Sequence, residues 1–186
     1  MRDLVLKMTI SLDGFVGDLD GGNGWMFGTD AVAKAWSVET LRGAGLHIMG
    51  SRTFARMAAH WPTADGPFAA PMNDIPKAVF SRRGRAVQPP GAGSWAEAHV
   101  AQGELAEEVA ALKAQPGKPI IAHGGAGFAR SLVAGGMVDR FVLLVAPVAL
   151  GRGLPLFTDL AAPLPLALIE SRAFPGGAVA QTYRPA

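Results

Sequence analysis

The feature that most constrains the fold is a regular alternation of short apolar segments with amphipathic ones, in which many apolar segments end in a glycine- or hydroxyl-rich turn. Apolar runs of this kind predict buried strands, and strands that alternate with helices form parallel sheets covered on both faces. The expected strands cover residues 4–10, 15–16, 46–49, 77–81, 119–122 and 138–145, and a further strand begins at Ser94-Trp95. The expected helices cover residues 31–41, 50–60, 103–114 and 128–133.

The last part of the chain follows a different pattern. Two strand-like segments, Leu166–Phe174 and Val179–Tyr183, flank the turn Pro175-Gly176-Gly177, which predicts an antiparallel hairpin. The sequence therefore predicts an α/β fold with a central, mostly parallel mixed sheet, helices on both faces and an antiparallel hairpin at its C-terminal end. No boundary interrupts the pattern, so residues 1–186 are expected to form a single domain.

Composition excludes several classes of protein. Hydrophobic residues make up 49% and charged residues 17%, which is typical of a globular chain and not of a disordered one. The net charge of +2 offers no dense basic field for nucleic acid. Cysteine is absent, which excludes thiolate catalysis, and the four histidines lack the spacing of metal ligands, so no metal site is expected.

The N-terminal residues do not resemble a signal peptide, because an acidic residue follows at once and no long apolar run is present. The longest apolar run, Phe141–Ala146, is far short of the ~20 residues that span a bilayer. We therefore expect a cytoplasmic protein without membrane contact.

The turn Gly124-Gly125-Ala126-Gly127 follows an expected strand and precedes a helix. Exposed N–H groups at the positive end of a helix, with no side chain in the way, can bind a diphosphate. An ordinary strand-to-helix turn is the alternative. A Rossmann fingerprint is disfavoured, because Arg130 stands where the third glycine should be and no acidic residue follows at the spacing of a ribose ligand.

Two further turns carry groups that suit phosphate. Gly50-Ser51-Arg52-Thr53 combines hydroxyls and a guanidinium at a helix start, and Ser81-Arg82-Arg83 follows the next strand. Helix capping and a solvated surface loop are the alternatives for these two turns. All three turns follow strands of one parallel sheet, so they are expected to meet at the edge where such sheets bind ligands.

Carboxylates near the first loop are candidates for proton donation or substrate anchoring. Asp13 follows the first strand, and Asp30 precedes the first helix, which Thr29 and Asp30 can cap. Turn formation and helix capping are the alternative roles for both aspartates. Serine hydrolases and P-loop kinases are excluded, because neither the G-x-S-x-G elbow nor the Walker loop occurs.

Several motifs occur in one order and resemble the RibD C-terminal, dihydrofolate-reductase-like family. They extend from near the N-terminus to Phe157 and read MTISLDGFV at 8–16, MGSRTF at 49–54, HGGA at 123–126, VDR at 138–140 and APVALGRGLPLF at 146–157. The resemblance implies a three-layer dihydrofolate-reductase-like fold. It also implies NADPH as cofactor, with hydride transfer to a small heterocyclic or carbonyl-like substrate.

The resemblance assigns cofactor contacts to residues of all three turns and of the first loop. The diphosphate would lie on Gly124, Gly125 and Ala126, with other phosphate contacts from Gly50, Arg52 and Thr53. Ser81 and Arg82 would meet the adenosine ribose and its 2′-phosphate. The nicotinamide would lie beside Ser11, Asp13, Gly14 and Val16, under a closing loop formed by residues 18–25.

The resemblance leaves the substrate open between a pyrimidine of the 5-amino-6-(5-phosphoribosylamino)uracil type, from riboflavin biosynthesis, and a pterin. Against the pyrimidine, Trp25-Met26-Phe27-Gly28 is apolar where a ribose phosphate would need basic residues. Asp30 follows Trp25 by five residues, as the catalytic carboxylate does in dihydrofolate reductases. The resemblance also suggests a homodimer. The alternative is a non-catalytic protein that binds NADP or another small ligand on the same fold.

Overall fold

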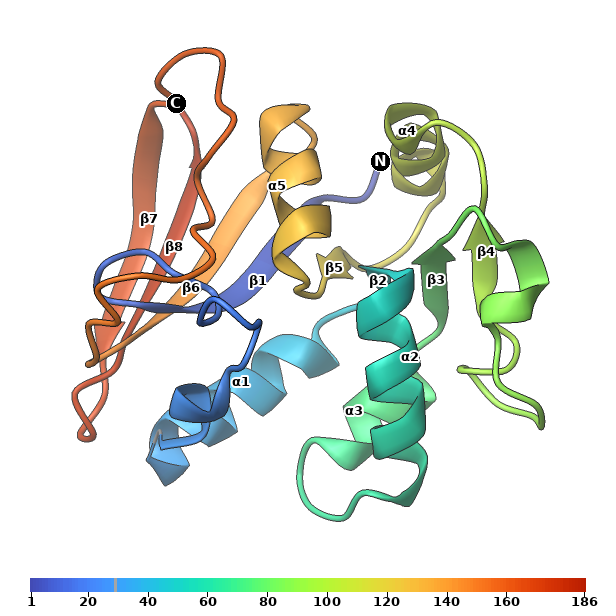
Figure 1. Ribbon diagram of the computed structural model, residues 1–186, viewed down its shortest axis with the longest axis horizontal. Coiled ribbons are helices and arrows are strands. Elements are labelled where there is room, and N and C mark those ends of the chain that lie inside the picture. Colours follow the sequence, from blue (N-terminus) through green and yellow to red (C-terminus); the bar gives the residue numbers. More distant parts are fainter. Residues whose placement is uncertain (29) are drawn as a thin grey trace. The chain divides into compact units, whose positions relative to one another are not determined.

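The structure is a computed structural model that describes residues 1–28 and 30–186 (Figure 1). In these residues it has eight strands and five α-helices, joined by turns and three short 3₁₀ segments. The chain divides into two compact units. Unit 1 comprises residues 1–4 and 37–125, and unit 2 comprises residues 5–36 and 126–186.

Unit 1 contains a parallel sheet of four strands in the order β4-β3-β2-β5. These are β2 (Leu46–Gly50), β3 (Lys77–Phe80), β4 (His99–Ala101) and β5 (Ile120–Ala122). Strands β2, β3 and β5 are almost wholly buried, as their apolar sequences predict. The helices of this unit are α2 (Ser51–His60), α3 (Ala69–Asp74) and α4 (Leu105–Ala114), and the 3₁₀ segments are η2 (Trp61–Thr63) and η3 (Gly84–Val87).

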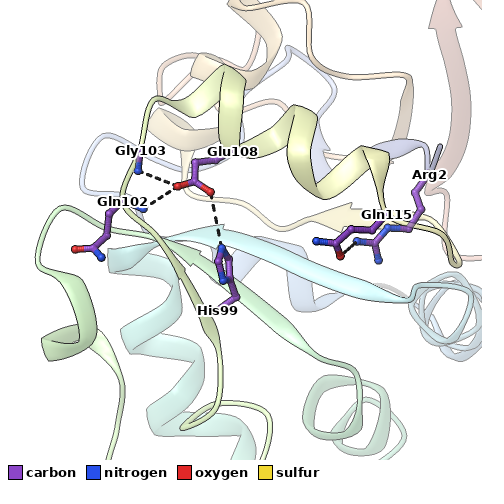
Figure 2. A network of polar contacts seen from close by, with 6 residues as sticks. All are labelled: Arg2, His99, Gln102, Gly103, Glu108 and Gln115. Carbon is purple, nitrogen blue, oxygen red and sulfur yellow. Dashed lines mark hydrogen bonds and ion pairs between the residues drawn. The ribbon is translucent and has the colours of Figure 1, made fainter.

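Polar side chains anchor both ends of α4 within unit 1 (Figure 2). At its start the Glu108 carboxylate accepts hydrogen bonds from the backbone N–H groups of Gln102 and Gly103. At its end the buried Arg2 guanidinium donates to the Leu112 carbonyl oxygen, where the helix dipole favours a cation. These bonds tie the N-terminal residues and the β4–α4 loop to one helix.

Unit 2 contains four strands in the order β1-β6-β8-β7. β1 pairs with β6 in parallel, and β8 is antiparallel to both β6 and β7. Helix α1 runs from unit 2 into unit 1, and its first half packs on a cluster formed by Leu144, Phe174 and neighbouring alanines. The elements are β1 (Leu4–Ser11), η1 (Gly24–Gly28), α1 (Ala31–Arg42), α5 (Ala126–Ala134), β6 (Arg140–Ala146), β7 (Leu166–Ala173) and β8 (Val179–Pro185).

The predicted fold class is confirmed. Strands alternate with helices along most of the chain up to β6, and the pairs β1–β6, β2–β3, β2–β5 and β3–β4 are parallel. The chain closes in the antiparallel β7–β8 hairpin. No described helix combines the length and the apolar character needed to cross a bilayer.

Three expected elements were placed wrongly. The strand expected at Ser94-Trp95 lies later, at β4, because Trp95 belongs to a turn and donates its indole N–H to the Asn73 side chain. The strand expected at Phe15-Val16 is a single antiparallel bridge between Phe15 and Pro155. Helix α3 forms inside the proline- and glycine-rich segment that was expected to be a loop. Thr29, predicted to share in capping α1, lies outside the described residues.

Candidate functional site

Unit 1 brings three predicted phosphate-binding turns to one edge of its sheet, which we call the carboxyl edge. Gly50 pairs with Phe80 across β2 and β3, and Ile48 pairs with Ala122 across β2 and β5. Since the strands are parallel, the turns that follow them open on the same side. The edge therefore carries the predicted cofactor residues Gly50, Arg52, Thr53, Ser81, Arg82, Gly124 and Gly125.

The turn after β5 lies directly against the first turn of α2. Gly125 has a φ of 106°, and a Cβ atom added there would lie 2.5 Å from the Thr53 hydroxyl oxygen. No L-residue fits such a position without moving its neighbour, and the backbone conformation itself favours glycine. Contact with Thr53 and the backbone conformation thus both require glycine here, and they bring the backbone of this turn beside the first turn of α2.

The start of α2 is the second part of this edge. Gly50 occupies the N-cap position and supplies no side chain, and no side-chain hydrogen bond caps the helix. Helix N-termini leave backbone N–H groups without intrahelical partners, and these groups attract anions. Thr53 is half-buried beside them, and the Arg52 side chain is exposed.

The turn after β3 supplies the basic part of the edge. Ser81 is buried, its N–H donates to the Ala101 carbonyl, and its hydroxyl oxygen accepts the N–H of Arg83 at 3.2 Å. These bonds fix the turn, while the side chains of Arg82 and Arg83 remain exposed. The arrangement presents exposed guanidinium groups on a fixed backbone, which suits recognition of a phosphate.

In unit 2 the predicted residues Ser11, Asp13, Gly14 and Val16 lie at the end of β1 and in the loop that follows it. The Asp13 carboxylate accepts the Ser11 hydroxyl at 2.6 Å and the N–H groups of Leu150 and Gly151 at 3.0 and 2.7 Å. The Ser11 hydroxyl, helped by the two backbone donors, lowers the pKa of Asp13 to about 2. The Asp13 carboxylate is therefore ionised at neutral pH and joins two loops by hydrogen bonds, an arrangement that we call a latch.

The loop that contains Leu150 and Gly151 also contacts the loop after β1 through its backbone, so two motifs that are distant in the sequence lie side by side. Backbone hydrogen bonds join Leu12 with Val148 and Val16 with Leu154. A side chain at Gly153 would collide with the Gly17 carbonyl oxygen. Residues 148–156 thus support the loop of residues 11–17, a role that the sequence did not reveal because the two segments are far apart in the chain.

Asp30 lies at the start of α1 in unit 2. Its carboxylate accepts the N–H groups of Val32 and Ala33 at 2.8 and 2.9 Å, and the N–H of Gly176 in the hairpin turn at 2.7 Å. The bond from Ala33, followed by those from Gly176 and Val32, lowers the pKa of this carboxyl. The helix-capping alternative therefore describes the contacts of Asp30, and an ionised carboxylate has no proton to donate.

Sequence reasoning missed one titratable group of unit 2, Lys7 on β1. Burial lowers the pKa of Lys7 to about 8, and its Nζ atom lies 5.6 Å from the centre of the Trp36 ring. Trp36 in turn packs against Phe174. The available signal was the single cation within the apolar strand Leu4–Ile10. Lys7 is half-buried, and an ammonium group with a pKa of about 8 can supply a proton.

The remaining predicted contact, Ala126, is the first residue of α5 and directly follows Gly125. His123 and His47 stack edge to face at 4.5 Å, and burial with the nearby Lys77 charge lowers the pKa of His47 to about 3. The described residues contain no group of three or more acidic or histidine side chains that could hold a metal ion.

The family follows from the sequence match. Residues 2–180 match the RibD C-terminal domain. The chain belongs to the RibD C-terminal domain family. A relative of this RibD-like chain is the uncharacterized protein YyaP of Bacillus subtilis, which is 28% identical over 98% of the chain and 94% of YyaP.

Solved structures are similar to this RibD-like chain at lower identity and therefore support the fold alone. The diaminohydroxyphosphoribosylaminopyrimidine deaminase/5-amino-6-(5-phosphoribosylamino)uracil reductase of Thermotoga maritima has a TM-score of 0.72 at 15% identity. That match covers 100% of this chain and 57% of the Thermotoga chain. Dihydrofolate reductase of Enterococcus faecalis, complexed with NADP(H), has a TM-score of 0.62 at 12% identity, covering 98% and 96% of the two chains. The fold is thus dihydrofolate-reductase-like.

Proposed function

We propose that this chain is an NADPH-dependent reductase that transfers hydride to a small heterocyclic substrate. The observation that carries the proposal is the close approach of Gly125 to Thr53 on the carboxyl edge of unit 1. It places the backbone of this turn beside a helix start without a side-chain cap, where backbone N–H groups can hold a diphosphate. The family, and the NADP(H) bound to the similar dihydrofolate reductase, support the same interpretation.

In this proposal each turn of the carboxyl edge has a separate task. Gly124, Gly125 and Ala126 hold the diphosphate through backbone N–H groups. Gly50, Arg52 and Thr53 complete the phosphate contacts at the start of α2. Ser81 and Arg82 hold the adenosine ribose and its 2′-phosphate, because a guanidinium pairs with phosphate oxygens through two hydrogen bonds.

The loop of residues 11–17 is proposed to position the reacting ring. NADPH supplies the hydride when bound, so the protein must orient the ring and exclude water. Asp13 serves this task indirectly, since its bonds to Leu150 and Gly151 hold the loop that carries Gly14 and Val16. The φ of 87° at Gly14 allows the sharp reversal after β1.

The proton that accompanies hydride is proposed to come from Lys7. Both Asp13 and Asp30 have a lowered pKa and are occupied by two or more N–H donors each, so we assign them to positioning. Lys7 is largely protonated at neutral pH, and its pKa of about 8 lies close enough for efficient transfer. A positive charge beside Trp36 would also attract an electron-rich ring.

For the substrate, we propose a pyrimidine or a pterin bound by a homodimer of this chain. The Thermotoga protein of the same fold is named a 5-amino-6-(5-phosphoribosylamino)uracil reductase, which supports a pyrimidine. The apolar residues Trp25 and Met26 favour a flat ring without a phosphate. Once cofactor binding is shown, pyrimidines and pterins should both be screened as substrates.

The test is a titration of NADPH and NADH into the purified protein, followed by quenching of its four tryptophans. We expect NADPH to bind more tightly than NADH, and Arg82→Ala to weaken NADPH roughly tenfold while leaving NADH unchanged. Arg56→Ala is the matched control, because Arg56 is also exposed and lies on α2 outside the proposed contacts.

The outcomes separate the two candidate functions. NADPH binding followed by oxidation in the presence of a pyrimidine or pterin supports the reductase. Tight NADPH binding with no turnover of any acceptor in the panel supports the non-catalytic alternative, which the full occupation of both aspartates favours. If neither nucleotide binds, both are wrong, and the three turns are ordinary strand-to-helix connections.

A further inference from the structure

A cavity of about 560 Å³ lies in unit 1 at the amino ends of its strands, opposite to the carboxyl edge. Its walls come from the starts of β2, β3 and β4, the turn before β4 and the end of α4. The volume falls in the range of small-molecule sites, about 300 to 1,000 Å³. The proposed reductase function uses none of the residues that line it.

Two buried cations line this cavity. Arg2 is 8% exposed and Lys77 is 2% exposed. Charged side chains are rarely buried unless an opposite charge or a ligand accompanies them. In the described part of the chain, no carboxylate oxygen lies within 4.0 Å of either cation.

Neutral acceptors hold both cations but do not neutralise them. Arg2 donates to the Leu112 carbonyl. It also donates to the Gln115 side chain (Figure 2), which leaves the two N–H groups of Nη1 for another acceptor. Lys77 donates to the Ile75 carbonyl and the Ser94 hydroxyl, and an ammonium group has three donors. The floor of the cavity thus combines two positive charges with unused hydrogen-bond capacity.

The rim has the opposite charge. Asp74 and Glu97 line the cavity with exposed side chains, and the influence of Asp74 on Lys77 is smaller than that of burial, which lowers the pKa of Lys77 to about 8. Acidic groups at the entrance disfavour nucleic acid and other polyanions. A small ligand with one anionic group can reach the buried cations without crossing an extended negative surface.

We propose that this cavity binds a small organic anion, whose carboxylate or phosphate group pairs with the buried cations that line it. A planar guanidinium offers two parallel donors to an oxyanion, and the lysine adds a compact charge. The Gln115 amide NH₂ group supplies a neutral hydrogen bond to the rest of the ligand. The site is separate from the carboxyl edge and does not depend on the proposed reductase function.

Trp95 provides a reporter within the protein. Its ring centre lies 4.6 Å from the Lys77 Nζ atom, and its indole N–H is held by Asn73. We would titrate the ¹⁵N-labelled chain with inorganic phosphate and, separately, with acetate, and follow the four indole N–H signals by NMR. Trp95→Phe assigns the reporter signal. The two titrations distinguish a phosphate site from a carboxylate site.

We expect the Trp95 signal to shift saturably with at least one probe, while Lys77→Met raises the apparent Kd about tenfold or more. Lys34→Met is the matched control, since Lys34 is exposed and lies in unit 2. Arg52→Met tests for phosphate bound at the carboxyl edge, and the Trp95 response should survive it. The proposal is wrong if neither probe shifts Trp95 or if Lys77→Met leaves the titration unchanged.

A second measurement needs no variant, in case Lys77→Met fails to fold. Acetylation of the wild-type chain by a water-soluble reagent can be followed at each lysine by mass spectrometry. A bound anion should slow acetylation of Lys77 severalfold while Lys34 reacts at an unchanged rate. Equal rates at Lys77 with and without each probe would overturn the proposal.

Discussion

The carboxyl edge of unit 1 and the aspartate-bearing loops of unit 2 differ in whether their polar groups already have hydrogen-bond partners within the protein. At the edge, Gly50 leaves α2 without a side-chain cap, and Gly125 leaves a backbone turn bare. In unit 2, Asp13 and Asp30 are occupied by backbone N–H donors from their own unit. Groups that remain open can bind a ligand, whereas groups that are already paired hold the protein together. This difference is the reason for which we propose recognition by glycine and arginine, and positioning by aspartate.

The largest effect is expected from a bulky side chain in the glycine turn after β5. Gly125→Val places a branched side chain at a φ of 106° and against the Thr53 hydroxyl. We expect NADPH affinity to fall about a hundredfold or more, because the diphosphate would lose its backbone cradle. Fluorescence titration measures the loss.

Gly127→Ala is the matched control for this variant. No atom lies within 4 Å of a Cβ added at Gly127, which is helical, so affinity should stay the same. Normal binding by Gly125→Val would show that this turn is not the cradle.

A second variant tests whether the proton donor is a lysine. Lys7→Met should lower turnover of any accepted substrate about a hundredfold while NADPH affinity changes little. Lys34→Met, on an exposed lysine of the same unit, should change neither. Full turnover by Lys7→Met would return the proton-donating role to one of the aspartates.

The same variant has a pH signature that requires no substrate. The pKa of Lys7 is about 8 in the folded chain and 10.5 as the ordinary value, so the unfolded chain binds more protons between these pH values. The free energy of unfolding of the wild type should therefore rise from pH 8 to 10.5, by up to about 3 kcal/mol. Denaturant titrations should show a smaller rise for Lys7→Met, and an equal rise in both would contradict the burial of this charge.

The latch formed by Asp13 predicts a smaller effect. Asp13→Asn should lower the melting temperature by a few degrees at neutral pH, since it weakens the bonds to Ser11, Leu150 and Gly151. Its pKa of about 2 lies below the ordinary value of 3.8, so the stabilising effect is present above about pH 4 and is lost as the pH falls toward 2. Melting curves of both proteins should converge in acid, and a constant difference would argue against an ionised latch.

The smallest effect is expected at Asp30. Asp30→Ser keeps an N-cap for α1 but cannot reach Gly176 as well. Turnover should change less than about tenfold, because a cap does not take part in proton transfer. Asp30→Asn is the companion variant, and a loss of about a thousandfold or more in both would identify Asp30 as the proton donor instead.

The sequence predicted that three turns meet at one edge of the sheet, and this could be predicted because the turns are local. A glycine or hydroxyl turn directly after an apolar strand can be recognised within about ten residues, and parallel strands bring such turns to one side. The register of Gly50 with Phe80 and of Ile48 with Ala122 agrees with that expectation. The strand near Ser94 was misplaced because the buried Trp95 reads as part of a strand, although its indole N–H is held by Asn73.

By itself, the sequence determined most of the order of elements, though not helix α3, together with the antiparallel C-terminal hairpin, the family and the three turns of the carboxyl edge. Only the tertiary structure decided what the charged groups do. Whether Asp13 is an acid or a latch depends on Leu150 and Gly151, more than a hundred residues away. Whether Lys7 and Lys77 carry lowered pKa values depends on burial. Periodicity and turn chemistry act over a few neighbouring residues, whereas solvation and hydrogen bonding of a charge are set by whatever the fold brings beside it.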